Sequence, residues 1–249
     1  MSIDVVDLRD FYANRLGSVA RHFIGRAIRR RWSDAKGLRM VGLGYATPYL
    51  GPFREEAERC LAFMPAAQGV VKWPSTQPAL SALVDEFELP LPDAAVDRVL
   101  LVHSLEISHD ATALLREVWR VLAAGGQLLA VVPNRRGLWA RMDTTPFGQG
   151  LPYSRTQITH LLRDAWFTPV SWGEALYVPP IPRGWFLRSA VAWERAGATI
   201  SAPFAGMHIV EATKQVYRAI PARREKRKLL PALEPALAPS PAPRGAARL

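Results

Sequence analysis

Leu38-Arg-Met-Val-Gly-Leu-Gly-Tyr-Ala-Thr-Pro-Tyr-Leu50 is the stretch of this sequence that decides the fold. It begins as an apolar, strand-like segment, passes through the turn Gly42-Leu-Gly44-Tyr-Ala46, and continues as a helical pattern after Pro48. Glycine allows a backbone to adopt positive φ and to approach a ligand where a side chain would clash. A strand that enters a helix through such a turn predicts a nucleotide- or cofactor-binding α/β unit, with a turn that serves only packing as the alternative.

Strand-like and helix-like segments alternate on both sides of this turn, which is typical of parallel βαβ units. The expected strands are Leu38–Leu43, Cys60–Met64, Ser81–Val84, Arg98–Val102, Gln127–Val132, Val170–Val178 and Met207–Tyr217. The expected helices are Val5–Trp32 with a possible break at Gly17, Tyr49–Arg59, Asp110–Leu122 stopped by Gly125–Gly126, Ser154–Ala165 with a capping box of Ser154 and Gln157, and Trp185–Ala196.

The composition indicates one globular core. The chain has 249 residues, of which 49% are hydrophobic, and its apolar runs are far shorter than the roughly 20 residues of a membrane-spanning helix. The segment Met1–Asp10 has no secretory signal pattern, so we expect a cytoplasmic protein without membrane insertion. The single cysteine, Cys60, excludes an internal disulfide and a thiolate metal cluster, and we expect it to be buried.

The net charge of +10 is unevenly distributed, because residues 218–249 contribute +6 of it. The segment Pro221–Leu249 combines prolines, alanines and basic residues, a composition that predicts a disordered tail. The overlapping basic cluster Arg218–Lys228 could contact nucleic acid or acidic lipid, but no aromatic residues are interspersed there, which favours a solvated tail. The expected organisation is a helical cap at 1–35, a domain at 36–218 and the basic tail at 219–249.

Two further motifs follow the glycine turn. They are Leu89-Pro-Leu-Pro-Asp93 before a predicted strand, and Leu114-Leu-Arg-Glu-Val-Trp-Arg-Val-Leu-Ala-Ala-Gly-Gly126 before the next one. In this order and spacing, the three motifs resemble the class I S-adenosylmethionine-dependent methyltransferases, in particular the type 11-like branch with "LPFPD" and "LREIxRVLxPGG". The resemblance covers Leu38 to about Val132.

This resemblance implies a Rossmann-like three-layer α/β/α sandwich with a seven-stranded, mostly parallel sheet and an antiparallel last strand. It also implies methyl transfer from S-adenosyl-L-methionine to a small or medium acceptor. The implied cofactor contacts are Gly42, Gly44, Tyr45 and Ala46 at the methionine part, Met64 at the ribose and adenine, Asp85, Glu86 and Phe87 beside the adenine ring, and His103 and Ser104 at the mouth facing the methyl group.

Two side chains are candidates for a catalytic role. His103 could act as a general base, because histidine titrates near neutral pH, but a hydrogen-bonded histidine at a strand end is the alternative. Tyr12 lies on the N-terminal helix, which in this family often closes over the cofactor, but Tyr12 also fits the apolar stripe of that helix. Loops at 133–139 and 145–153 are rich in aromatic residues and predict an acceptor pocket, where Arg135 and Arg136 could hold an anionic group.

The sequence departs from the family pattern at three points. Arg39 and Met40 replace an acidic residue before the glycines, Met64 stands where the family has a ribose-binding carboxylate, and Ile107 replaces the histidine of "LEH". These departures keep a second hypothesis open, a non-catalytic binding or scaffolding protein of the same fold. An RNA methyltransferase is a third. The five histidines lack metal-ligand spacing, and no G-x-S-x-G turn supports a hydrolase.

Overall fold

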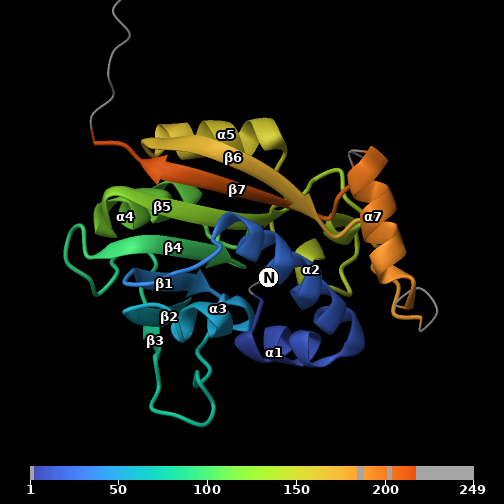
Figure 1. Cartoon of the computed structure of the whole chain (residues 1–249), viewed down its shortest axis with the longest axis horizontal. Helices are drawn as coiled ribbons and strands as arrows, with labels where there is room; N and C mark the ends of the chain where they lie inside the picture. The colour runs from blue at the N-terminus through green and yellow to red at the C-terminus, as the bar shows by residue number, and fades with distance from the viewer. Residues whose placement is uncertain (1–2, 184–187, 201–203, 217–249) are drawn as a thin grey trace, which may run out of the picture. The chain divides into compact units, whose positions relative to one another are not determined.

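A seven-stranded mixed sheet forms the centre of the computed structural model, which describes residues 3–183, 188–200 and 204–216 (Figure 1). The strands are β1 Arg39–Gly44, β2 Arg59–Pro65, β3 Ser81–Val84, β4 Val96–Val102, β5 Leu122–Pro133, β6 Phe167–Ala175 and β7 Met207–Lys214. Their order is β3-β2-β1-β4-β5-β7-β6, with β1–β5 parallel and β7 antiparallel to both of its neighbours. The predicted fold class is therefore confirmed.

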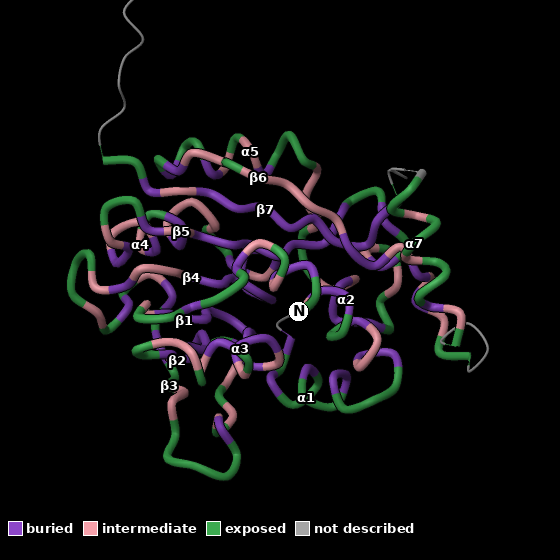
Figure 2. The backbone as a smooth tube through the Cα atoms, viewed as in Figure 1, coloured by how far each residue is buried: buried purple, intermediate pink, exposed green. Residues whose placement is uncertain are grey.

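Helices cover both faces of the sheet and make three layers. The first hydrophobic cluster joins α1 Val5–Ala13, α2 Arg15–Arg31 and α3 Thr47–Arg54 to one face. The second joins α4 Ala111–Val121 and α5 Arg155–Asp164 to the other face. Neighbouring residues of β4 divide between the clusters, with Leu100 in the first and Val99 in the second. Because both faces are covered, the central strands are buried along most of their length (Figure 2).

The N-terminal helical region breaks at Asn14, so the predicted break at Gly17 is wrong by three residues. Asn14 has an extended ψ of 170°, and its side chain caps α2 by accepting a hydrogen bond of 2.8 Å from the Gly17 amide. A Cβ on Gly17 would collide with the carbonyl oxygen of Phe11. Gly17 therefore allows the end of α1 to pack closely on α2, while the polar cap sets the boundary.

Other boundaries also differ from the predictions. Helix α3 begins before Tyr49, because Pro48 occupies its first turn, where proline is favoured. Helix α4 ends at Val121 and β5 begins directly at Leu122, so Gly125, at φ +75°, lies within β5 and does not stop the helix. Strand β6 ends before Leu176, whose φ of +64° breaks the extended conformation.

Some predictions are confirmed in detail and others lie outside the described residues. The capping box of α5 has both of its hydrogen bonds, between Ser154 and Gln157. Cys60 is buried, and burial raises the pKa of its thiol to about 12. Helix α7 spans Ala190–Ile200, whereas the predicted start at Trp185 and the predicted disordered tail fall on residues that are not described. Within the described ranges, no helix has the length and apolarity needed to cross a membrane.

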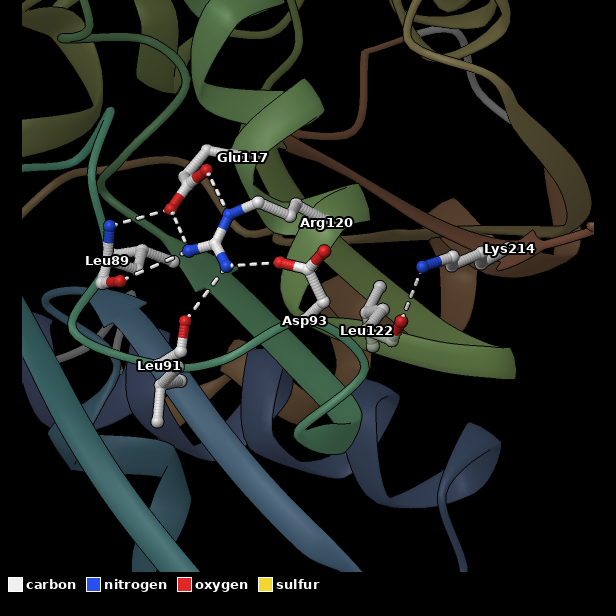
Figure 3. A network of polar contacts seen from close by, with 7 residues as sticks. All are labelled: Leu89, Leu91, Asp93, Glu117, Arg120, Leu122 and Lys214. Atoms are coloured by element: carbon white, nitrogen blue, oxygen red, sulfur yellow. Dashed lines mark hydrogen bonds and ion pairs between the residues drawn. The ribbon is translucent and has the colours of Figure 1, made fainter.

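Arg120 explains why the two motifs after the glycine turn occur together. Its guanidinium donates to the carbonyl oxygens of Leu89 and Leu91 at 3.2 and 2.9 Å, and it pairs with Asp93 at 2.7 Å and Glu117 at 2.6 Å (Figure 3). Glu117 in turn accepts the Leu89 amide at 2.7 Å. One arginine of α4 thus fixes the loop that precedes β4. These contacts between the two motifs stabilise the fold of the domain.

Replacing Arg120 by Met should lower the free energy of unfolding by about 2–4 kcal/mol, because it leaves two loop carbonyls without their donor and the mostly buried Glu117 carboxylate without its cation. Urea denaturation followed by circular dichroism measures the change. Arg116→Met is the matched control, since Arg116 lies on the same helix but only contacts the exposed Trp166 ring. Equal stability losses in the two variants would contradict this role of Arg120.

Arg39, one of the departures from the family pattern, has a structural partner. Its amide and guanidinium donate to the Asp97 carboxylate in three hydrogen bonds of 2.9–3.0 Å, which join the starts of β1 and β4. These hydrogen bonds from Arg39 hold the pKa of Asp97 below its usual value. Because the parallel strands start here, this pair lies at the opposite end of the strands from the glycine turn.

The depressed pKa makes the contribution of Asp97 to stability dependent on pH. It is fully present above the unfolded-state pKa of about 3.9 and is lost as the pH falls through the lower folded-state pKa. We expect Asp97→Asn to cost about 1 kcal/mol at pH 7 and progressively less below about pH 4. Urea denaturation at pH 7, 5 and 3 measures this, with Asp143→Asn on an exposed loop as the charge-matched control. A difference that does not change with pH would contradict it.

Candidate functional site

The glycine turn presses against the end of β4. Gly44 has a φ of +85°, and a Cβ there would lie 2.7 Å from the carbonyl oxygen of His103 and 2.9 Å from the Ser104 Cβ. The next amide, that of Tyr45, donates to the Val102 carbonyl at 2.8 Å. Gly42 has a different task, because a Cβ there would lie 2.7 Å from Ala46 and hold α3 away from β1. Only glycine is compatible with the turn at Gly44.

His103 lies at the point where β4 ends, with its side chain fully buried. Its φ of +49° is unusual for a residue other than glycine, and such conformations are enriched at functional sites. Its Nε2 lies 2.9 Å from the Tyr12 hydroxyl, and its Nδ1 lies 3.3 Å from Oε1 of the buried Glu106. The ring packs on Phe147, with 4.8 Å between the centroids. The histidine therefore has a carboxylate on one side and a hydroxyl on the other.

Helix α1 covers this place with its aromatic residues. The Tyr12 ring stacks on Tyr45 with 5.7 Å between centroids, and its hydroxyl also lies 2.9 Å from the hydroxyl of Tyr49. Burial raises the pKa of both hydrogen-bonded phenols, so they are protonated at neutral pH. Tyr12 thus belongs to the buried stripe of α1 and at the same time lies directly on the glycine turn. The packing role of Tyr12 is therefore confirmed, and its closure over a cofactor stays a prediction.

Several buried polar atoms gather here without a hydrogen-bond partner among the described residues. They are Gln68 Oε1 and Ser104 Oγ, together with His103 Nδ1 and Glu106 Oε1, which face one another at 3.3 Å without forming a hydrogen bond. Gln68 comes from the turn after β2, and its amide nitrogen donates to the His103 carbonyl at 3.2 Å. Burying a polar atom without a hydrogen bond costs roughly 1–3 kcal/mol. A cluster of such atoms indicates a position for water or for the polar groups of a ligand.

The remaining predicted cofactor contacts lie in two other places. Met64 is fully buried in the core, where its sulfur accepts the Val71 amide at 3.4 Å. The Asp85-Glu86-Phe87 segment after β3 connects to the loop after β4, because Glu86 accepts a hydrogen bond of 2.7 Å from Ser108. Burial raises the pKa of Glu86. Met64 and this segment therefore lie outside the group of candidate residues that the structure brings into direct contact, which are Tyr12, Gly44, Tyr45, His103 and Ser104.

Three members of this cluster, Tyr49, Gln68 and Glu106, were not among the predicted site residues, whereas Phe147 lies in the loop 145–153 that was predicted to line an acceptor pocket. Tyr49 follows the glycine turn by one helical turn, and Glu106 is three residues from His103, so spacing was an available signal for both. Phe147 belongs to the aromatic loop after β5, which bends back over the loop after β4 through a hydrogen bond of 2.7 Å from the Leu151 amide to the Glu106 carbonyl. Arg135 and Arg136 of that region are exposed.

Two cavities border α1 on the side of the aromatic loop. One of about 410 Å³ separates Asp7, Asp10 and Phe11 from Thr144, Pro146 and Gln149. A second of about 440 Å³ lies between Asn14, Leu16, Pro180 and Pro182. The contact between α1 and this loop is therefore loosely packed. Across the residues that the structure describes, no group of three or more His, Cys, Asp or Glu side chains is arranged to hold a metal ion.

Comparisons with known proteins agree with this architecture. Residues 41–130 match the family model described as "Methyltransferase domain". A "Probable S-adenosylmethionine-dependent methyltransferase" of Mycobacterium tuberculosis is 38% identical over 86 residues, which are 34% of this chain and 31% of that protein. Ajmaline N-methyltransferase of Rauvolfia serpentina is 30% identical over 98 residues, which are 38% of this chain and 32% of that protein. The matches thus span about a third of these relatives.

Solved structures with the same fold include a methyltransferase in complex with the Trm112 activator of Haloferax volcanii, with a TM-score of 0.61, 18% identity and coverage of 86% of this chain and 100% of that one. The [4+2]-cyclase SpnF has a TM-score of 0.55 at 21% identity, with coverage of 78% and 80%. These likenesses concern the fold. The segment 41–130 is therefore similar to a methyltransferase domain, and the chain has the fold of solved methyltransferases.

Proposed function

We propose that this chain transfers a methyl group from S-adenosyl-L-methionine to a small or medium acceptor. One observation carries the proposal: Gly44 at φ +85° packs against the end of β4, beside buried polar atoms that have no partner among the described residues. This combination lies within the segment that matches the methyltransferase family. In open α/β sheets, ligands bind outside the carboxyl ends of the strands, which is where these residues lie.

The residues at the strand ends fit the methionine end of this cofactor. The backbone at Gly44 is open to close approach, and the Ser104 hydroxyl is a buried polar group that a ligand could satisfy. The Tyr45 ring supplies an aromatic face for the positively charged sulfur. When bound, the cofactor supplies an electrophilic methyl group on that sulfur. The chain itself would orient the acceptor and exclude water.

The ribose contact requires a different residue from the usual carboxylate. At the end of β2 the chain reads Met64-Pro65-Ala66, and Met64 is fully buried. Gln68, three residues after Pro65, is the buried polar side chain that this turn directs toward the end of β4. We propose that Gln68 takes over part of the hydrogen bonding to the cofactor. An amide makes a weaker contact than a charged carboxylate, so a modest affinity is expected.

A non-catalytic binding protein with the same fold is the second candidate. It is favoured by the missing carboxylates and by helix α1, which covers the glycine turn with Tyr12. Several chemistries occur on one fold, as the structural likeness to a [4+2]-cyclase illustrates. The third candidate, an RNA methyltransferase, gains support only from charge, because α2 carries six arginines and no acidic residue. It predicts strongly salt-dependent RNA binding.

Titration with S-adenosyl-L-methionine and S-adenosylhomocysteine by calorimetry tests the proposal. We expect micromolar binding by the wild type and at least about a 100-fold loss in Gly44→Ala, whose Cβ would collide with backbone oxygens and disturb the cradle. Gly51→Ala is the matched control, because a Cβ at Gly51 meets open space on helix α3. Thermal unfolding confirms that each variant is folded, and Ser104→Val replaces Gly44→Ala if that variant is not.

Two outcomes would contradict the enzyme proposal. The first is the absence of binding to the wild type at millimolar cofactor, which would favour the non-catalytic alternative. The second is unchanged binding in both Gly44→Ala and Ser104→Val, which would mean that the cofactor does not occupy the glycine turn. Loss of binding in Gly51→Ala as well would show a general effect on stability. The Ser104→Val result would then decide whether the cofactor occupies the glycine turn.

A further inference from the structure

We propose that the methyl acceptor is a phenol or a related aromatic alcohol, that its hydroxyl binds where the Tyr12 hydroxyl now lies, and that His103 accepts its proton. Glu106 acts as a positioning residue for His103. This inference rests on the proposed function and names the acceptor class for that site. Its basis is the arrangement of Tyr12, an aromatic alcohol of the chain itself, between an aromatic wall and an imidazole.

Tyr12 is held as a bound ligand would be. Its ring stacks on Tyr45 at an interplanar angle of 20°, and the Tyr49 ring meets it edge-on with 5.9 Å between centroids. Its hydroxyl has two partners at 2.9 Å, the Tyr49 hydroxyl and His103 Nε2. Stacking and edge contacts select a planar aromatic ring, and two hydrogen bonds select a hydroxyl over a hydrogen atom or a methyl group.

Glu106, on the other side of the His103 ring, determines which ring nitrogen carries the proton. Glu106 Oε1 lies 3.3 Å from Nδ1, both side chains are almost completely buried, and Glu106 Oε2 accepts the Ser104 amide at 3.3 Å. A carboxylate beside Nδ1 favours the tautomer with its proton on that nitrogen, which leaves the Nε2 lone pair facing the phenolic hydroxyl. The hydroxyl then donates to Nε2. This is the arrangement of a general base with its substrate.

Helix α1 must move for an acceptor to reach this position, because Leu8, Phe11 and Tyr12 of α1 are buried in the first hydrophobic cluster. It is nine residues long and separated from α2 by the extended residue Asn14, which provides a hinge. The two cavities beside Phe11 and Thr144 show that its contact with the aromatic loop is incompletely packed. When Tyr12 leaves, Tyr45, Tyr49, His103 and Phe147 remain as the walls of an aromatic pocket. An acceptor phenol would reproduce the contacts of Tyr12 there.

The chemical step is balanced with these groups. The acceptor O–H bond breaks and its proton passes to His103 Nε2, while the oxygen electron pair forms the new O–CH₃ bond. The electron pair of the broken S–CH₃ bond stays on sulfur and cancels its positive charge. Glu106 stabilises the imidazolium that results. No additional oxidant, reductant or metal ion is required.

The first test uses binding and needs no cofactor. Tyr12→Ala should bind p-cresol saturably, and about tenfold more tightly than toluene, because only the cresol hydroxyl can replace the two lost hydrogen bonds. The wild type should bind p-cresol more weakly, since Tyr12 competes for the same place. Adding His103→Asn to Tyr12→Ala should reduce the preference for p-cresol over toluene, because only the Tyr49 hydroxyl then remains as an original partner of the cresol hydroxyl. Calorimetry with the full chain measures each affinity.

Tyr177→Ala is the matched control, because Tyr177 is also a partly buried tyrosine with a hydrogen-bonded hydroxyl, 2.8 Å from Glu174, and it lies away from His103 in the contacts described. It should not gain p-cresol binding over the wild type. Equal affinities of Tyr12→Ala for p-cresol and toluene, or a preference that His103→Asn leaves undiminished, would overturn the proposal. Since no cofactor is present, this failure is distinct from a failure of the proposed function.

A second measurement keeps the proposal testable if Tyr12→Ala does not fold. The wild type with S-adenosyl-L-methionine should convert p-cresol to 4-methylanisole. His103→Asn should lower kcat by about 10²- to 10⁴-fold, a larger effect than on cofactor affinity, and Glu106→Gln should lower kcat with little change in KM. Cofactor binding without methylation of p-cresol would overturn the acceptor assignment while leaving the proposed function intact.

Discussion

The close approach between the glycine turn after β1 and the end of β4 is the constraint on which the rest of this structure depends. A Cβ on Gly44 would collide with backbone atoms of Val102 and His103, so the turn can exist only with glycine. This contact places His103 and Ser104 beside Tyr45. It also leaves buried polar atoms at the strand ends, which is where the open α/β fold binds ligands.

The opposite ends of the same strands serve stability. There Arg39 and Asp97 join β1 to β4, and Arg120 fixes the loop that leads into β4. The strand ends are thereby divided between two tasks. At the end with Arg39, Asp97 and Arg120, these charges are paired. The other end, at the glycine turn, retains a strained histidine and buried polar atoms without a hydrogen bond among the described residues. Backbone strain and buried polar atoms without hydrogen bonds persist where ligand binding compensates for their energetic cost. This asymmetry supports a functional site at Gly44 and not at the motifs held by Arg120.

Much of the fold was predictable from sequence because its signals are local. Buried parallel strands appear as short apolar runs, and the capping box of Ser154 and Gln157 gives a helix start through hydrogen bonds that span three residues. Boundaries were less predictable where one backbone conformation decides them. Leu176 ends β6 with a φ of +64°, and the Asn14 side chain, not Gly17, divides α1 from α2. Leucine does not require a positive φ, and asparagine does not require the extended backbone that Asn14 adopts.

The sequence by itself determined the α/β class, the glycine turn and the candidates His103 and Tyr12, because each depends on residue types at short spacing. Only the tertiary structure decided that Tyr12 and His103 share a hydrogen bond, although they are 91 positions apart along the chain. It also brought Gln68 to the end of β4 and excluded Met64 from the polar cluster. The physical reason is that the packing of α1 against the sheet, and the crossover order of β1, β2 and β4, set these distances, and no local pattern encodes them.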